Sequence, residues 1–509
     1  MGRKKGVLFS YILMAAEIVS SLVFTPFLIR SFGQSEYGVY SLSLSITAYL
    51  FLLDLGVGNA MVRFFSKYHV EGDVESQRKL LGVSLVFYLA VAAVMCGICF
   101  ALQGSFSNVF AGGLNPSEID LAKTLLYITI ANAAFTLIFS IFDKVLIAYE
   151  YFSISKVIQI IKIVFRLAIQ FPLLLLGFKS VAIAASNLLL TLVFGVGCML
   201  FVMRKFELRP ALKGCELGFI KETVGYSFFV FLQMVATQIN ALADQVLLGM
   251  MTSAAVLGVY AVGSQLNQYL QSVASGINGV TMPGIVRLVE EGSTVDSVLA
   301  EMVKIGRLCF IVLGIIVGGF IAVGSDFVSL WAGAENKQAY MVALILMLPM
   351  MFTLIQSPGV QVLWAKGRHR LQAIIKIGVA VTNIGLTISL IKWNPLLGAA
   401  MGTAISCILG DVIAMNIAYK RDIGISIKSY YRKMLKGILP SAFLASVSCK
   451  TLAFFLPLGW LSLASEIVLA LLVYGVCLWL FGMNQYEKNL IANVVDKLAK
   501  DTGSAKWRR

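Results

Sequence analysis

Apolar runs of about twenty residues, the length that a helix needs to cross the hydrocarbon core of a bilayer, recur along this whole 509-residue chain. Hydrophobic residues make up 59% of the chain and charged residues only 13%, so a soluble protein of this size could not cover its surface. The runs are too long and too unalternated for barrel strands, and backbone groups in lipid must be satisfied internally. The sequence therefore predicts an all-α polytopic membrane protein.

About fourteen membrane spans are predicted from these runs. They lie at roughly 9–30, 39–62, 80–103, 119–142, 155–176, 180–203, 222–248, 255–286, 303–323, 338–363, 371–391, 395–419, 434–456 and 459–482. Most of the 41 lysines and arginines fall in alternate connectors, which the positive-inside rule assigns to the cytoplasm. With an even number of spans, both termini are then cytoplasmic.

The net charge of +15 is explained by these connectors, so we expect no nucleic acid partner. The connectors on the opposite side are short, the longest being about 104–118 and 324–337, which leaves no room for an external catalytic domain. The two histidines, His69 and His369, lie in basic loops, and Cys96 and Cys99 have no second pair for a metal site. We therefore predict no catalytic residue, no metal and no cofactor, and a protein that is not an enzyme.

An internal repeat relates two parts of the chain. The segment Ser35–Tyr40 (SEYGVY) is echoed about 220 residues later by Ala255–Tyr260 (AVLGVY). Three further matches follow in the same order at similar spacing, pairing 106–112 with 327–333, 160–163 with 374–377 and 181–184 with 399–402. Six spans per repeat give both halves the same orientation, hence two parallel six-helix lobes. The predicted divisions are 1–213 and 214–430 for the lobes, 431–484 for an extra helix pair and 485–509 for a basic cytoplasmic tail.

Buried cations mark the first candidate site, because charges inside spans are costly. Lys162 and Arg166 lie one turn apart on one face of the fifth span, together with Gln159. They predict a site for an anionic head group, with the arginine able to hold phosphate by two parallel hydrogen bonds. The alternatives are a structural pairing with acids on a neighbouring helix, or a Lys162 that reaches the cytoplasmic surface. Lys376, the repeat partner of Lys162, and Arg63 are further candidates for binding the anion.

Acids and amides inside other spans form the second group of candidates. Glu17, Asp54 and Asp244 are candidates for ion coupling or for balancing the cations, although structural pairing explains any one of them equally well. Uncharged amides suit sugar hydroxyls or a hydrated cavity, and hydrogen bonds between helices are the alternative. The glycan candidates are Gln159, Gln233, Gln238, Asn240, Gln268, Gln271 and Asn278.

One motif resembles a known family. Phe32, Gly33, Tyr37, Gly38 and Tyr40, followed by the stretch 54–63 (DLGVGNAMVR), are similar to the opening of the polysaccharide biosynthesis membrane proteins. These proteins are flippases for undecaprenyl-diphosphate-linked oligosaccharides, in a superfamily with multidrug exporters and peptidoglycan-precursor flippases. The resemblance implies alternating access driven by an ion gradient or the membrane potential, in the bacterial inner membrane. It transfers no individual site residue.

The function that follows is movement of an O-antigen or exopolysaccharide type repeat unit from the inner to the outer leaflet. The expected partners are the lipid-linked oligosaccharide, membrane lipids and other polysaccharide-assembly proteins. A cation-coupled multidrug exporter is one alternative, disfavoured by the extra helix pair and the cationic fifth span. A glycosyltransferase or polymerase is disfavoured by the short outer loops, and a scaffold for polysaccharide assembly stays open.

Overall fold

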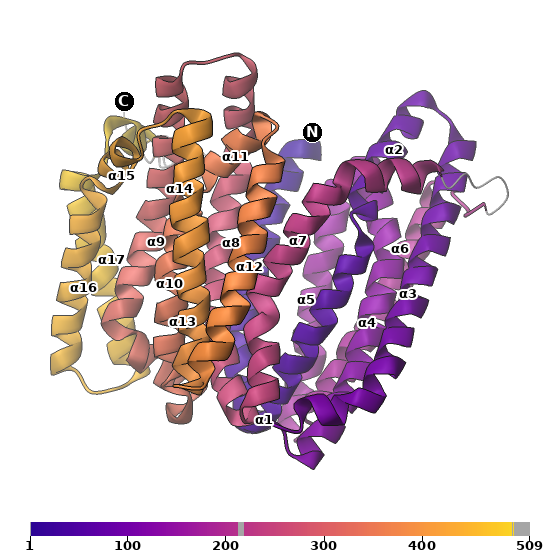
Figure 1. Ribbon diagram of the computed structural model, residues 1–509, viewed down its shortest axis with the longest axis horizontal. Coiled ribbons are helices and arrows are strands. Elements are labelled where there is room, and N and C mark those ends of the chain that lie inside the picture. The colour runs from indigo at the N-terminus through magenta and orange to yellow at the C-terminus, as the bar shows by residue number, and fades with distance from the viewer. Residues whose placement is uncertain (1, 212–217, 491, 493–509) are drawn as a thin grey trace, which may run out of the picture. The chain divides into compact units, whose positions relative to one another are not determined.

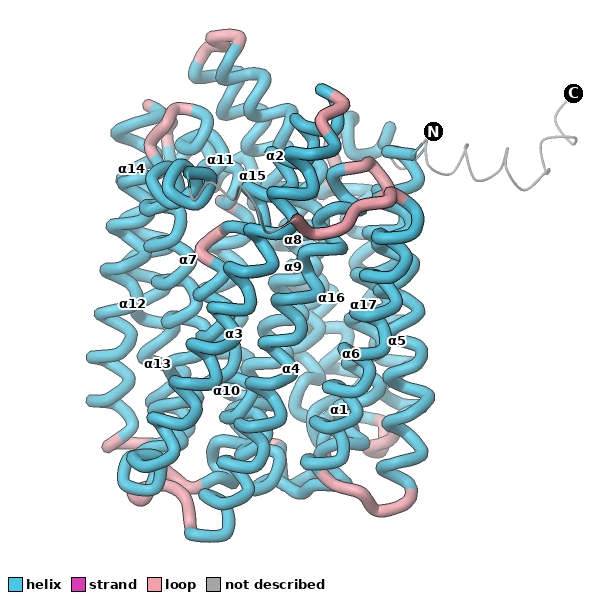
Figure 2. Tube along the Cα trace, turned by 90° about the vertical axis from the view of Figure 1, so that its right-hand side faces the viewer, coloured by secondary structure: helices cyan, strands magenta, loops and turns pink. Residues whose placement is uncertain are grey.

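The computed structural model describes residues 2–211, 218–490 and 492. Within these residues every regular element is a helix, and none of them forms a strand (Figure 2). The all-α prediction is therefore confirmed. Long helices dominate because each one satisfies its own backbone hydrogen bonds while it presents apolar side chains on all sides.

The first half of the chain forms eight α-helices and one short 3-10 helix (Figure 1). They are α1 (Gly2–Leu50), η1 (Phe51–Asp54), α2 (Val57–Glu71), α3 (Val74–Phe110), α4 (Pro116–Ala148), α5 (Phe152–Leu175), α6 (Ser180–Lys205), α7 (Gly218–Met251) and α8 (Ala254–Glu290).

The second half has a larger number of short and interrupted elements. They are α9 (Val295–Ala332), η2 (Ala334–Asn336), α10 (Ala339–Ile355), α11 (Ser357–Ala365), α12 (His369–Ile391), α13 (Pro395–Cys407), η3 (Ile408–Ala414), α14 (Met415–Ala418), η4 (Tyr419–Ile423), α15 (Ile427–Leu435), α16 (Ile438–Phe455), α17 (Trp460–Cys477) and η5 (Leu478–Gly482).

Ten helical stretches among the described residues are long and apolar enough to cross a membrane, or eleven if the bent pair α10–α11 counts as one span. The stretch Phe9–Val70 contains the first two predicted spans, 9–30 and 39–62. The predicted spans 222–248 and 255–286 fall on α7 and α8. The chain is thus a multi-pass membrane protein.

Glycines interrupt the stretch Phe9–Val70 at two places. Gly33 has φ +77°, a backbone conformation that only glycine adopts without strain, and it separates the first two predicted spans inside α1. After η1, Leu55 and Gly56 are both left-handed, with φ 49° and 78°. The predicted span 39–62 is therefore not one continuous helix but breaks just after Asp54.

Polar side chains fix the starts of two helices outside the apolar stretches. Asn115 and Glu118 form a reciprocal capping box at the start of α4, with Pro116 in the first turn. Asp73 caps α3 by accepting a hydrogen bond from the Ser76 backbone N–H at 2.9 Å. Hydrogen bonds from Ser76 stabilise the carboxylate and lower the pKa of Asp73 below its ordinary value.

The chain forms two compact units, which are described separately. Unit 1 comprises Met1–Gln265 and His369–Asp411, and unit 2 comprises Leu266–Arg368 and Val412–Arg509. In unit 1, α4 packs between α3 and α6 and buries an apolar stripe (Figure 1). In unit 2, α9 packs against α10, α15, α16 and α17. The lobe boundaries expected at 213 and 430 stay a prediction.

Within unit 1, repeat-related residues of α1 and α8 contact each other reciprocally. A Cβ atom on Gly38 would lie 2.1 Å from the Ala254 carbonyl oxygen, and one on Gly258 would lie 2.2 Å from the Gln34 carbonyl oxygen. Positions 34 and 38 correspond to 254 and 258 in the repeat, so each helix offers the other the same surface. Contacts of this reciprocal kind are expected across a two-fold axis. These reciprocal contacts support the predicted repeat.

A pair of hydrogen bonds follows the same symmetry. Ser45 donates to the Gln245 side chain at 2.5 Å, and Gln265 donates to Thr25 at 2.9 Å. Because 25 corresponds to 245 and 45 to 265, the two bonds are repeat equivalents. Only glycine at positions 38 and 258 lets the two backbones approach closely enough for these side chains to meet.

Candidate functional site

A cavity of about 450 Å³ lies inside unit 1, between α1, α4, α5 and α6. It is lined by Glu17, Tyr40, Leu44, Asn132, Thr136, Gln159, Lys162, Ile163, Arg166, Asn187, Leu190 and Thr191. The predicted cations Lys162 and Arg166 therefore face one space, with the predicted residues Gln159 and Glu17. The apolar spacing of α5 turns its polar stripe inward, because the opposite face carries exposed apolar side chains such as Val164 and Phe165.

The two cations of this cavity have neutral partners. The Lys162 Nζ atom donates to Thr191 Oγ1 at 3.1 Å, and the Arg166 Nη2 atom donates to Ser20 Oγ at 3.1 Å. Neither cation forms an ion pair with an acid of the described chain. Glu17 lines the same cavity but is exposed. The structure thus leaves Lys162 and Arg166 without a bound carboxylate.

Two buried polar atoms of the cavity have no hydrogen-bond partner among the described residues. They are the Nε atom of Arg166 and the Oδ1 atom of Asn132. A buried charged or polar group that lacks a partner is costly, so such groups are rarely left without one in the working protein. An anion entering the cavity would accept from the Arg166 Nε–H group, and a hydroxyl group could donate to the Asn132 oxygen.

Amides and hydroxyls complete the wall of this cavity. Gln159 donates to Ser155 at 3.3 Å, and Asn187 accepts a hydrogen bond from Gln170 at 3.0 Å. Gln170 itself is buried and also donates to Ser186 at 3.0 Å, so it holds α5 against α6. Cations and amides together suit a ligand that carries both anionic and hydroxyl groups.

A second polar cluster in unit 1 surrounds Asp244 on α7. This carboxylate is only 3% exposed and accepts hydrogen bonds from the hydroxyls of Tyr260, Thr387 and Thr403, the one from Thr387 being 3.1 Å long. The amide oxygen of Asn383 lies 3.0 Å from each of the same two threonine hydroxyls, and each hydroxyl has one proton to donate either to this oxygen or to Asp244. The helices α7, α8, α12 and α13 thus bring five oxygen-bearing side chains together.

The Asp244 cluster holds a buried acid without a basic partner among the described residues. Oxygen atoms of a carboxylate, hydroxyls and an amide are the ligands that hard cations prefer, and a carboxylate in such a place can also hold a proton. The sequence singled out Asp244 and Asn240, but not Tyr260, Thr387 or Thr403. Asn383 and Thr387 are four residues apart and therefore share one face of α12. This spacing could have identified both residues as members of the Asp244 cluster.

The other predicted charges lie apart from these two places. Lys376 forms an ion pair of 2.8 Å with Asp411, which is 3% exposed, at the short π-helix η3. Asp54 accepts a hydrogen bond from the Tyr88 hydroxyl at the break that follows η1. Arg63 on α2 is exposed, and its guanidinium lies 5.8 Å from the centre of the Phe64 ring. Substrate or coupling roles for these residues stay predictions.

The predicted glycan amides also divide between several places. Gln238 donates to the Ala48 carbonyl at 3.3 Å, and Asn240 accepts from Asn383 at 3.1 Å, both in unit 1. Gln268, Gln271 and Asn278 belong to unit 2, where Asn278 accepts from the Cys309 thiol at 3.5 Å. Gln233 is half-buried on α7. Of this set, only Gln159 lines the cationic cavity.

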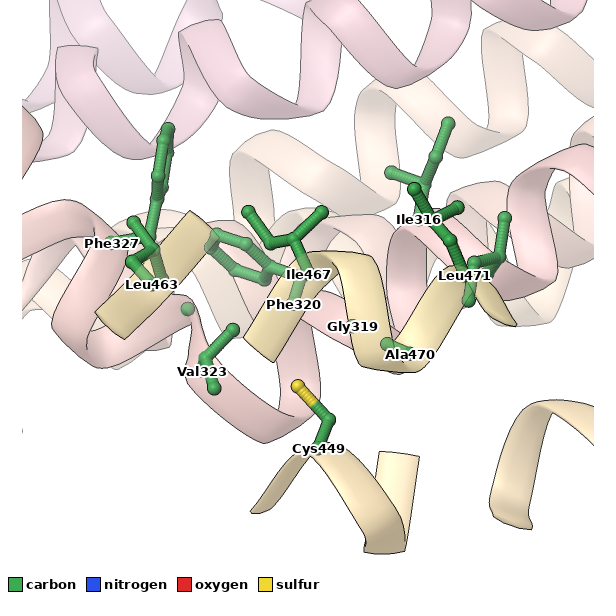
Figure 3. Close-up of a pocket in the computed structure, with 12 residues that line it drawn as sticks. Ile316, Gly319, Phe320, Val323, Phe327, Cys449, Leu463, Ile467, Ala470 and Leu471 are labelled. Carbon is green, nitrogen blue, oxygen red and sulfur yellow. The ribbon is translucent and has the colours of Figure 1, made fainter. Parts of the chain in front are cut away.

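An apolar cavity of about 300 Å³ lies in unit 2 between α9, α16 and α17 (Figure 3). It is lined by Ile315, Ile316, Gly319, Phe320, Val323, Gly324, Phe327, Cys449, Leu463, Ile467, Ala470 and Leu471. Gly319 on α9 has nothing within 4 Å of its Cβ position, and no charged side chain lines the cavity. Its chemistry suits a hydrocarbon chain.

These features define a polytopic membrane protein, and solved structures share its fold. The lipid II flippase MurJ in an inward closed conformation superposes with a TM-score of 0.70 at 15% identity, covering 96% of this chain and 99% of that one. A multidrug resistance MATE family transporter of the MOP superfamily, in an inward-facing conformation, has a TM-score of 0.59 at 13% identity, covering 83% of this chain and 95% of that one.

The family is established by the sequence. The model of the family described as "Polysaccharide biosynthesis protein" matches residues 5–289, which is more than half of the chain. The chain therefore belongs to this family, as its motif at 32–63 indicated. It is also 21% identical over 489 residues to the "Uncharacterized membrane protein EpsK" of Bacillus subtilis (strain 168), covering 92% of this chain and 94% of that protein.

Proposed function

We propose that this protein is a flippase that carries an undecaprenyl-diphosphate-linked oligosaccharide from the inner to the outer leaflet of the bacterial inner membrane. The observation that carries the proposal is the cavity of unit 1, where Lys162 and Arg166 are half-buried and have no acid partner among the described residues. A diphosphate would supply the anionic oxygens that these cations lack. Both termini are cytoplasmic in this proposal, and the protein has no enzymatic activity.

Each part of such a substrate has a chemical counterpart in the chain. The diphosphate fits Lys162 and Arg166, because a guanidinium holds phosphate through two parallel hydrogen bonds. The sugar hydroxyls fit the amides of Asn132, Gln159 and Asn187 around them. The polyprenyl tail fits the apolar cavity between α9, α16 and α17. The helices α16 and α17 are the predicted extra pair.

Coupling to an ion gradient is proposed to use Asp244. A proton or a small cation bound among Asp244, Thr387 and Thr403 would neutralise a buried carboxylate that otherwise stands alone. Binding and release of that charge then shift the equilibrium between two conformations, as alternating access requires. The same acid would also serve a cation-coupled drug exporter, which is the second candidate function.

The test replaces the cations singly and measures surface polysaccharide in cells that lack their own copy of the gene. Arg166→Ala and Lys162→Ala each remove a charge-assisted contact of roughly 1.5–3 kcal/mol, so we expect transport to fall about tenfold to a hundredfold. Arg166→Glu should abolish it. Lys156→Ala is the matched control, because Lys156 lies on α5 but not in the cavity.

Membrane abundance of each variant is measured by immunoblot, and lipid-linked oligosaccharide should accumulate in cells that carry the defective variants. Normal surface polysaccharide in all cavity variants at normal abundance would refute the proposed anion site. Loss of resistance to cationic drugs, with polysaccharide unchanged, would instead favour the exporter.

A further inference from the structure

The short helix α15 is amphipathic and joins two membrane spans. Ser426 caps its start by accepting from the Ser429 backbone N–H at 3.3 Å. The preceding apolar stretch ends at Ile423, and the next, α16, begins at Ile438. With so few residues on either side, α15 must lie at the bilayer surface, on the basic side of the protein.

One face of α15 is buried in unit 2. Tyr430 and Met434, one turn apart, are 1% and 0% exposed. A Cβ atom on Gly306 of α9 would lie 2.5 Å from the Tyr430 hydroxyl, so a glycine there lets the ring approach closely. The orientation of α15 around its own axis is therefore determined by packing, not by the solvent.

The opposite face of α15 is basic and free of acids. Lys428, Arg432 and Lys433, together with Lys436 after the helix, are all exposed. None of the four forms an ion pair with a carboxylate of the described chain. Four cations within nine residues, next to a bilayer surface and without counter-charges, are typical of segments that bind anionic lipids.

The buried face of α15 also contacts a bend in the unit. The helices α10 and α11 meet at an angle of 42° around Gln356. The Tyr430 hydroxyl donates to the Ile355 carbonyl at 2.6 Å, and the Tyr431 hydroxyl donates to the Gln356 side chain at 2.8 Å. One backbone carbonyl and one side chain at the bend thus accept hydrogen bonds from α15, so α15 supports the bend.

We propose that the basic face of α15 is a binding site for the head groups of anionic phospholipids, and that the bound lipid holds α15 against the α10–α11 bend. A phospholipid is the fitting occupant because α15 lies between two spans at the membrane surface, where the local concentration of anionic head groups is high. Membrane composition then affects the stability of unit 2 through Tyr430 and Tyr431. This inference does not depend on what the protein transports.

The experiment uses the purified full-length protein in a neutral detergent and adds phosphatidylglycerol or phosphatidylcholine. Thermal unfolding and the number of retained lipids, counted by native mass spectrometry, are the two measurements. The test variant is the triple Lys428→Gln, Arg432→Gln, Lys433→Gln. The matched control removes the same number of charges at another cytoplasmic end, as Arg204→Gln, Lys205→Gln, Arg209→Gln.

We expect phosphatidylglycerol to raise the unfolding temperature of the wild type and of the control, and phosphatidylcholine to have no such effect. The α15 variant should bind phosphatidylglycerol about a hundredfold more weakly, since each charge near the surface contributes roughly a factor of five. A variant with lysines exchanged for arginines (Lys428→Arg, Lys433→Arg) should keep the wild-type response. Because this second variant keeps the charges while it changes the side chains, a normal response shows that the glutamine variant fails through lost charge and not through misfolding.

Two results with the lipids would overturn the inference. One is an α15 variant that responds to phosphatidylglycerol as the wild type does. The other is an equal loss in the α15 variant and in the control, because that would assign the effect to total charge and not to this helix. Added sodium phosphate at matched ionic strength should not raise the unfolding temperature. If it does so as strongly as the lipid, the site takes a free anion and not a head group.

Discussion

Removing the guanidinium of Arg307 should loosen unit 2 locally, and the size of the effect can be worked out from its contacts. Arg307 is 5% exposed and forms a bidentate ion pair with Glu487, which is 2% exposed, at 2.6 and 3.0 Å. It also donates to the carbonyl oxygens of Lys433 and Lys436 at 3.0 Å each and of Gly482 at 2.6 Å. One side chain on α9 thus ties the end of α15 to the chain that follows α17.

Replacing Arg307 by Ala leaves a buried carboxylate and several buried carbonyls without a donor. Breaking a buried pair in this way costs roughly 3–5 kcal/mol. If the lost free energy falls on a local opening of unit 2, the opened population rises from about a hundredfold to several thousandfold, since 1.4 kcal/mol corresponds to a factor of ten. Arg307→Lys keeps the charge but not the fork, so we expect an intermediate effect.

Cysteine labelling measures this opening directly. Cys309 lies two residues from Arg307 and is 0% exposed, while Cys99 on α3 is 9% exposed and belongs to unit 1. In variants that keep only one of these cysteines, a maleimide should label Cys309 about a hundred to several thousand times faster after Arg307→Ala. The labelling of Cys99 should stay as in the parent protein. A change of less than about tenfold at Cys309 would refute the assignment of this ion pair as the tie that closes unit 2.

Three further predictions follow from unit 1. Gly258→Leu should disrupt the α1–α8 crossing and lower the unfolding temperature and surface polysaccharide, whereas Gly97→Leu, with nothing within 4 Å of its Cβ position, should leave both unchanged. Asp244→Asn keeps the shape but not the charge, so transport by membrane vesicles should lose its dependence on an imposed ion gradient; unchanged dependence would exclude Asp244 as the coupling acid. Lys376→Met should destabilise the protein by roughly 3–5 kcal/mol because Asp411 stays buried, and adding Asp411→Leu should restore most of that loss in thermal unfolding.

The sequence alone indicated the class of fold and the family, and it predicted a repeat. Hydrophobic length is a local property of the chain, so apolar runs of span length predict helices without knowledge of their neighbours. The match between 35–40 and 255–260 predicted a duplicated unit, and the structure places those two segments against each other at Gly38 and Gly258. The polar stripe on α5 was equally readable, because residues three and four apart share one face of a helix.

Only the tertiary structure decided which buried charges have partners. Lys162 and Lys376 are predicted repeat partners and look alike in sequence. Lys376 nevertheless forms an ion pair with Asp411 of η3, whereas Lys162 donates a hydrogen bond to Thr191. Likewise, Tyr260, Thr387 and Thr403 come from three helices, and nothing local connects them to Asp244. A helix periodicity predicts which face a side chain occupies, but its partner depends on which other helix packs there and at what height. Those are properties of helix packing, which a single segment of sequence does not contain.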